Sequence, residues 1–265
     1  MNDSEDTKYD GLVDASLDSI GGITGTAIGF TLAGPVGAFV GAAAGPYVPV
    51  LVRKVASEFQ RHVLGQREER RIASVLELTV RRINSNLEQG YIVRQDDFFH
   101  LGEDDRSVAE EILEGVLIAT QRDHEEKKVR YYANLFANIA FREDIDRGLA
   151  NAILDLVEGW SYRKLVALAY FTRDDHCRPH FRFGDEQSVT RLSLGADVYS
   201  MGRQGVLILE DNNSYSIDVE IYGITEFGKV VAELMDLSDL DVSDVEEVGD
   251  ILAQNIGRWV KNRSK

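Results

Sequence analysis

The side chains with the strongest potential for chemistry lie in one short stretch, where Asp174 and Asp175 precede His176, Cys177 and His180. Imidazole and thiolate groups bind zinc well, but a structural zinc site normally draws on a second group of closely spaced donors. The sequence contains no second group of this kind. We therefore interpret the stretch as an ordinary polar loop and predict no metal site.

Other patterns that would indicate catalysis are missing from the sequence. The glycines of residues 34–45 have no lysine or arginine beside them to reach a phosphate, and no G-x-S-x-G nucleophile motif occurs. Asn134 and Asn138 are four residues apart, which places them on one face of a helix, where we expect them to bond neighbouring helices. The sequence thus predicts a protein that is not an enzyme and that uses no cofactor.

Length and charge set wider limits. The 265 residues give room for two modest domains, and a net charge of −16 would repel the phosphates of nucleic acids. The single cysteine cannot form an internal disulfide, so the fold does not depend on an oxidising compartment. The first eighteen residues carry six acidic side chains and one lysine, the reverse of a cleavable signal peptide. We expect a mainly cytoplasmic protein that does not bind nucleic acid.

The most unusual feature is an uncharged segment, residues 19–52, which is longer than the roughly 20 residues of a membrane span. Small residues recur in it at every fourth position, in the row Gly21, Gly25, Gly29, Ala33, Gly37, Gly41 and Gly45. On a helix such a row forms a flat ridge, along which two helices can approach closely within lipid. The row resembles the glycine zippers of channel-forming and membrane-inserting proteins, and it predicts membrane insertion and self-association.

The same segment is too long for one straight membrane span. Pro35 follows Gly34, and proline disfavours helix both at its own position and at the preceding residue. We therefore expect two helices that meet near this point, either as a glycine-rich hairpin that lies in or dips into a membrane or as a kinked span whose end lies at the interface. The alternative is a soluble hairpin buried in the core or in an oligomer interface, because apolar helices of roughly 10–14 residues are often core helices.

The charge next to the segment favours the membrane interpretation. Residues 53–82 are locally basic in an acidic protein, and Arg53, Lys54 and Arg61 follow the apolar segment, where a positive-inside anchor would contact the membrane surface. If the segment spans a membrane, we expect the C-terminal bulk of the chain to stay cytoplasmic and to be associated with the inner membrane when active. A solvated helix face is the alternative, since Glu77 and Arg81 are spaced for an ion pair.

Helical spacing of apolar residues continues along most of the chain, so the predicted fold class is mainly α. We expect helices over 55–87, from Asp105 or Ser107, over 125–140 and over 145–157. One apolar stripe in the first of these helices is predicted to cover the glycine row in the resting protein; it comprises Ile72, Val75, Leu76, Val80 and Ile83.

The C-terminal part combines helices with two strands. A helix capped by the Ser161 hydroxyl and a helix over 188–200 precede strands at 206–209 and 215–222, and Thr225 is the expected N-cap of a closing helix. Helices, a two-stranded wing and the Ile-Thr-x-x-Gly opening of the closing helix resemble a winged helix-turn-helix. A DNA-binding module needs basic side chains on its recognition helix and wing. This one offers only Arg191 and Arg203, and its wing is acidic, so we predict a protein-contact module.

These patterns divide the chain into five predicted parts. An acidic tail (1–18) leads into the glycine-rich membrane-active segment (19–52), which is followed by a helical domain (53–154). The winged-helix-like domain (155–237) precedes an acidic linker and a C-terminal amphipathic helix, placed at Ile251 to Val260 (238–265).

Several short motifs together resemble one known family. They are the helix KVRYYANLFAN that begins at Lys128, the helix start Trp160-Ser161-Tyr162, the segment 202–209, and the signature from Ile224 to Gly228. Their order is similar to that in the Abi-alpha type of bacterial abortive-infection protein. The resemblance implies a bacterial defence protein that halts or harms its own cell under phage infection, and it brings no catalytic residues.

The leading hypothesis is a non-enzymatic, pore-forming or otherwise membrane-perturbing effector in antiviral defence. Its predicted partners are the lipid membrane, further copies of the chain as a homo-oligomer, and an activating or inhibiting protein. The alternative is a soluble regulatory or scaffold protein that keeps the apolar hairpin in its core or in an oligomer interface.

Overall fold

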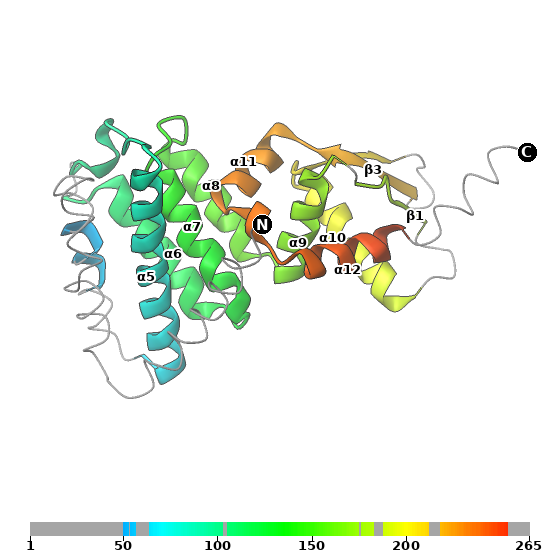
Figure 1. Cartoon of the computed structure of the whole chain (residues 1–265), viewed down its shortest axis with the longest axis horizontal. Helices are drawn as coiled ribbons and strands as arrows, with labels where there is room; N and C mark the ends of the chain where they lie inside the picture. The colour runs from blue at the N-terminus through cyan, green and yellow to red at the C-terminus, as the bar shows by residue number, and fades with distance from the viewer. Residues whose placement is uncertain are drawn as a thin grey trace, which may run out of the picture. The chain divides into compact units, whose positions relative to one another are not determined.

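The structure, a computed structural model, describes residues 50–52, 54–56, 64–102, 105–174, 176–182, 188–211 and 218–253 (Figure 1). The glycine row from Gly21 to Gly45 therefore lies outside the described residues, as do Arg53, Arg61 and positions 254–265. The chain divides into two compact units, Met1–Gly159 and Trp160–Lys265, called unit 1 and unit 2 below. The fold is mainly α, with antiparallel strands near the C-terminus, which confirms the predicted class.

The described part of unit 1 is helical. Residues 50–52 and 54–56 are helical, and the elements that follow are α5 (Gln66–Glu88), η1 (Asp97–Phe99), α6 (Val108–Arg122), η2 (Glu126–Lys128), α7 (Val129–Ile139) and α8 (Arg147–Glu158). Of the two predicted starts for α6, the structure selects Ser107: its hydroxyl accepts a hydrogen bond from the Glu110 N–H at 3.1 Å. This bond satisfies one of the donors left free at a helix N-terminus.

The core of unit 1 forms where α5 packs against α7 and α6, which lie side by side in Figure 1. The stripe from Ile72 to Ile83 is buried on α5, and the Thr79 hydroxyl on the same helix lies 3.5 Å from the Ala133 carbonyl oxygen of α7. The stripe predicted to cover the glycine row thus belongs to a helix with extensive packing partners in α6 and α7. The glycine row lies outside the described residues, so its cover by this stripe stays a prediction.

Unit 2 combines helices with a small sheet. Its elements are α9 (Tyr162–Thr172), β1 (His180–Arg182), α10 (Val189–Arg203), β2 (Leu207–Asp211), β3 (Asp218–Ile224), α11 (Glu226–Leu234), η3 (Leu237–Asp239) and α12 (Val242–Ala253). The strand order is β1-β3-β2 and both pairings are antiparallel, with Phe181 opposite Val219 and Leu207 opposite Ile224. Helix α9 packs against α10, α11 and α12.

Three sequence predictions for unit 2 need correction. The predicted two-stranded wing is part of a three-stranded sheet, because β1 lies in the stretch interpreted as a loop. Ser161 does occupy the N-cap position of α9, but its side chain makes no capping hydrogen bond. The helix that contains Ile251 begins at Val242, so much of the acidic stretch before Ile251 is helical, while the predicted helix beyond residue 253 lies outside the described residues.

The predicted cap of α11 is confirmed, since the Thr225 hydroxyl oxygen accepts a hydrogen bond from the Gly228 N–H at 3.0 Å. Gly228 itself is buried against β2. A Cβ atom added there would lie 2.2 Å from the Val206 carbonyl oxygen and 2.7 Å from Ile224 Cγ1. The glycine of the Ile-Thr-x-x-Gly signature therefore lets the first turn of α11 lie against the backbone that leads into β2.

Gly228→Ala should accordingly destabilise unit 2 by about 2–3 kcal/mol, because a backbone carbonyl cannot move aside as a side chain can. Urea unfolding of the full chain measures this change. Gly159→Ala is the control, since its Cβ would meet its nearest neighbour, the Leu156 carbonyl oxygen, at an ordinary 3.7 Å. Equal stability of the two variants would contradict the close approach at Gly228.

Candidate functional site

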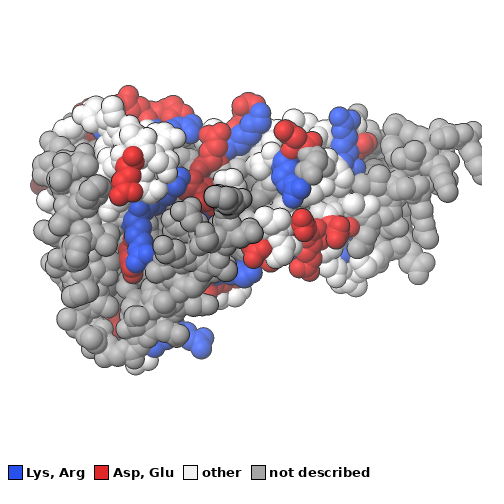
Figure 2. All heavy atoms as spheres, in the orientation of Figure 1, with Lys and Arg blue, Asp and Glu red and all other residues white. Residues whose placement is uncertain are grey.

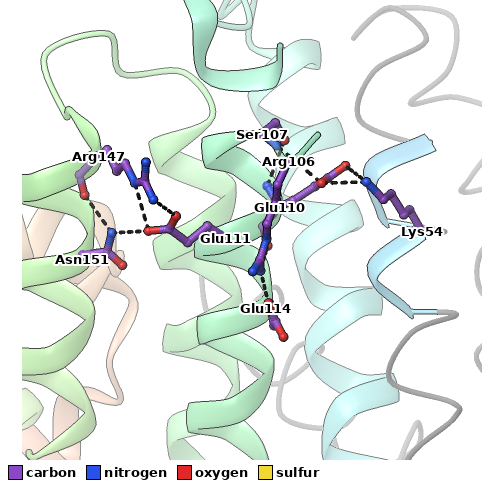
Figure 3. A network of polar contacts seen from close by, with 8 residues as sticks. All are labelled: Lys54, Arg106, Ser107, Glu110, Glu111, Glu114, Arg147 and Asn151. Atoms are coloured by element: carbon purple, nitrogen blue, oxygen red, sulfur yellow. Dashed lines mark hydrogen bonds and ion pairs between the residues drawn. The ribbon is translucent and has the colours of Figure 1, made fainter. Parts of the chain in front are cut away.

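The candidate site is the contact between the start of α6 and the helical residues that end the glycine-rich segment. The Lys54 ammonium group lies 2.9 Å and 2.8 Å from the two carboxylate oxygens of Glu110 (Figure 3). Glu110 is only 7% exposed, whereas the Lys54 side chain is 41% exposed. The carboxylate is therefore the fixed, buried member of this pair, and the lysine is the member that solvent reaches.

Glu110 also takes part in the N-terminal cap of α6. It is the third residue of the capping box at the start of α6, and one of its oxygens lies 3.4 Å from the Ser107 N–H. Because a buried carboxylate is costly unless it is paired and hydrogen-bonded, the lysine and the N–H together make its burial tolerable. The cap fixes the Glu110 side chain in position to receive Lys54.

The other glutamates of the network have different partners (Figure 3). Glu111 accepts hydrogen bonds from Arg147 and from the Asn151 amide of α8, the latter at 2.7 Å, and Glu114 pairs with Arg106. Burial opposes ionisation of Glu111, but the hydrogen bonds from Asn151 and Arg147 outweigh it and lower the pKa of this carboxyl group. Glu111 and Glu114 thus stabilise the packed helices of unit 1, whereas Glu110 binds Lys54, close to the end of the glycine-rich segment.

Apolar contacts accompany the ion pair. Among the helical residues around Lys54, the side chains of Leu51, Val52, Val55 and Ala56 are buried, whereas Val50 is exposed. Both kinds of contact therefore hold the helical residues 50–52 and 54–56 in place, and these residues begin five positions after Gly45, the last member of the glycine row.

Of the predicted site residues, Lys54 is the one that the structure describes. Its ammonium group pairs with Glu110 in the structure, and its contact with a membrane surface stays a prediction. The seven small residues of the row, together with Arg53 and Arg61, lie outside the described residues. None of the helices in the described part of the chain is long and apolar enough to span a membrane.

A second polar cluster stabilises the interior of unit 1. Lys128, 1% exposed, pairs with Asp123, which also accepts a hydrogen bond from the Tyr132 hydroxyl at 2.9 Å. Burial is the largest influence on Asp123 and opposes its ionisation, but the hydrogen bonds from Lys128 and the Glu125 N–H lower its pKa overall. Burial, reinforced by the negative Asp123, raises the pKa of Tyr132. This cluster is a closed structural unit, in which every member already has a partner.

The structure describes the stretch with the potential metal donors except for Asp175. The two ring nitrogens of His176 lie 2.6 Å from the Arg173 carbonyl oxygen and 3.4 Å from that of Tyr222. Cys177 is half-buried, and burial raises the pKa of its thiol. His180 begins β1, and Asp175 lies outside the described residues. Within the ranges that the structure describes, no three His, Cys, Asp or Glu side chains are close enough to hold a metal ion.

Arg191, one of the two basic residues considered for DNA contact, is buried in unit 2. Its guanidinium group donates hydrogen bonds to the carbonyl oxygens of Ile251 and Leu252, at 2.7 Å and 2.8 Å, and lies over the Phe181 ring. Burial lowers the pKa of this guanidinium group. A cation at the last carbonyls of a helix stabilises that end of it, so Arg191 serves α12.

The sequence predicted some polar contacts of unit 1 correctly but missed the one between Lys54 and Glu110. The Asn138 side-chain oxygen accepts hydrogen bonds from Asn86, at 3.0 Å, and from Arg82, both on α5, as expected for a residue that joins helices. The role of Glu110 was missed. Its spacing from Ser107 is a capping-box signal, but no local spacing links it to Lys54, which lies 56 positions earlier.

Comparison with known proteins gives no relative for the chain: no protein-family model, curated protein or solved structure matches it. The function must therefore be argued from the residues themselves.

Proposed function

We propose that the chain is a non-enzymatic membrane-perturbing protein, whose segment 19–52 inserts into a bilayer and associates with copies of itself to form a pore. The observation that carries this proposal is the combination of an uncharged segment with seven small residues in one row at period four. Lipid gives helices no hydrophobic reason to associate, so close backbone packing along such a row is the main attraction available.

The geometry of unit 1 supports separate roles for its helical core and for the glycine-rich segment attached to it. Helices α5, α6 and α7 form a packed core, to which the residues that follow the glycine row are bound through Lys54 and Glu110. A membrane-active segment attached to a stable helical body by a breakable contact is suited to a protein that must stay harmless until it is needed.

Unit 2, in this proposal, is a winged-helix-like module that contacts an activating or inhibiting protein. The burial of Arg191 supports this assignment over DNA binding, because it removes one of the two basic side chains that the module could offer. On the face drawn in Figure 2, the basic and acidic side chains of the described residues are interspersed, which also favours a protein partner.

We place this activity in bacterial defence against phage by abortive infection, on the strength of the motifs between Lys128 and Gly228. Most of the protein would then be cytoplasmic, and it would associate with the inner membrane when active. Its partners would be membrane lipid, further copies of itself and the regulating protein.

A second candidate function is a soluble regulatory or scaffold protein. One observation favours it: Leu51 and Val52, at the end of the apolar segment, are buried in the protein itself. If the rest of the segment were buried in the same way or in an oligomer interface, it would not reach a membrane.

Fractionation of cells that express the full chain separates the two candidates. We expect the protein to sediment with membranes on ultracentrifugation and to be released by detergent but not by high salt. The variant Ile28→Lys with Val40→Lys should move to the supernatant, because each buried lysine costs about 2.5–3.5 kcal/mol at the centre of a membrane helix. Recovery of the unaltered chain in the supernatant without detergent would favour the scaffold function.

A further inference from the structure

We infer that Glu110 is a restraint on the glycine-rich segment: by binding Lys54 it holds residues 50–56 on unit 1, and an anionic membrane surface releases them by competing for the lysine. This inference rests on the proposed membrane function and names its regulation. It begins from the Lys54–Glu110 pair, in which the Glu110 side chain is 9% exposed and the Lys54 side chain 41% exposed.

The position of Lys54 supports a switching role. It comes two residues after the end of the uncharged segment, so its binding partner determines where that segment begins to leave the protein. Lipid phosphates and carboxylates attract lysines next to a membrane segment. The Lys54 ammonium group can therefore exchange the Glu110 carboxylate for an anionic lipid headgroup at the membrane.

Loss of the lysine leaves the buried Glu110 carboxylate with fewer partners, which costs free energy, but it does not remove the cap of α6. When Lys54 leaves, the carboxylate still has the Ser107 N–H as a hydrogen-bond donor, and the Ser107 hydroxyl still caps α6. The contact can thus exist in two states, paired and released, while α6 stays folded.

The neighbouring glutamates do not share this property. Glu111 is bound to α8 through Arg147 and Asn151, and Glu114 is bound to Arg106, which also donates to the Glu110 carbonyl oxygen of α6. Their partners belong to the body of unit 1, so neutralising them leaves Lys54 in place. They are the matched controls for Glu110.

The test measures hydrogen exchange of the backbone amides of residues 50–56 in the full chain. Glu110→Gln removes the charge but keeps the capping box, because glutamine serves at this position as well as glutamate. We expect exchange in this peptide to become about tenfold faster, a change of about 1.4 kcal/mol. Lys54→Gln should give a similar increase, and the double variant should add little to either, because both changes remove the same contact.

Two control variants isolate the restraint from general stability. Glu111→Gln and Glu114→Gln each remove a neighbouring charge on α6, but both leave the Lys54–Glu110 pair intact. Neither should change exchange in residues 50–56. A second measurement, dye leakage from vesicles of phosphatidylglycerol and phosphatidylethanolamine, should be severalfold faster for Glu110→Gln than for the unaltered chain or Glu111→Gln.

The outcomes separate this inference from the proposed function. Unchanged exchange of residues 50–56 in Glu110→Gln would overturn the restraint, whatever the vesicles show. Faster exchange without faster leakage, from a chain that does cause leakage, would overturn its regulatory role. Absence of leakage from every protein tested would contradict the membrane function and regulation of it, while the exchange result would still decide whether Glu110 holds the segment.

Discussion

Asp123→Asn should destabilise unit 1 by about 3–5 kcal/mol, because removing one member of a buried ion pair leaves the other charge uncompensated. Lys128 is only 1% exposed, so little solvent is available to replace the carboxylate. Asparagine can still accept the hydrogen bond that Tyr132 donates to Asp123, so the loss reports mainly on the charge. Urea unfolding of the full chain, followed by circular dichroism, measures this change.

The pH dependence of the free energy of unfolding gives a second test of the role of Asp123. The pKa of Asp123 is lowered in the folded protein, so its stabilising contribution is present above its unfolded pKa of about 3.9 and is lost as the pH falls through the lower folded value. The difference between the unaltered chain and Asp123→Asn should therefore be constant above about pH 5 and shrink in stronger acid.

The control replaces both members of the pair. Asp123→Asn combined with Lys128→Met leaves no buried charge, so it should be more stable than Asp123→Asn alone. If the double variant were the less stable of the two, Lys128 would not depend on Asp123 for its burial.

Local patterns predicted much of the fold, for physical reasons that individual elements illustrate. Helix α11 and its Thr225 cap were predictable, because the cap and the glycine that it bonds are only three residues apart. Strand β1 was not. It has three residues, too few to show alternation, and it forms by pairing with β3 about forty positions later in the chain.

The candidate site divides in the same way. The pairing of Arg81 with Glu77 was predictable from helix geometry. The pairing of Lys54 with Glu110 depends on how two separate helices pack, and Arg191 is buried because the end of α12 packs over it. Sequence spacing predicts pairs of charged residues within one helix. Tertiary packing determines the pairs between helices and which charged side chains remain exposed to a partner protein.

The glycine row carries the largest functional effect that we expect. Leucine at Gly25, Gly29, Gly37 and Gly41 would make the segment more apolar, so its affinity for lipid should not fall. The added side chains would, however, prevent the close backbone contact on which association along a small-residue row depends. Membrane binding and pore formation should therefore separate in this variant.

Dye leakage from vesicles of phosphatidylglycerol and phosphatidylethanolamine, measured together with flotation of the protein on the same vesicles, tests the central claim most directly. The unaltered chain should bind and cause leakage. The chain with leucine at Gly25, Gly29, Gly37 and Gly41 should bind equally well but cause at least tenfold less leakage. Equal leakage from the two proteins would show that the glycine row is not what perturbs the membrane.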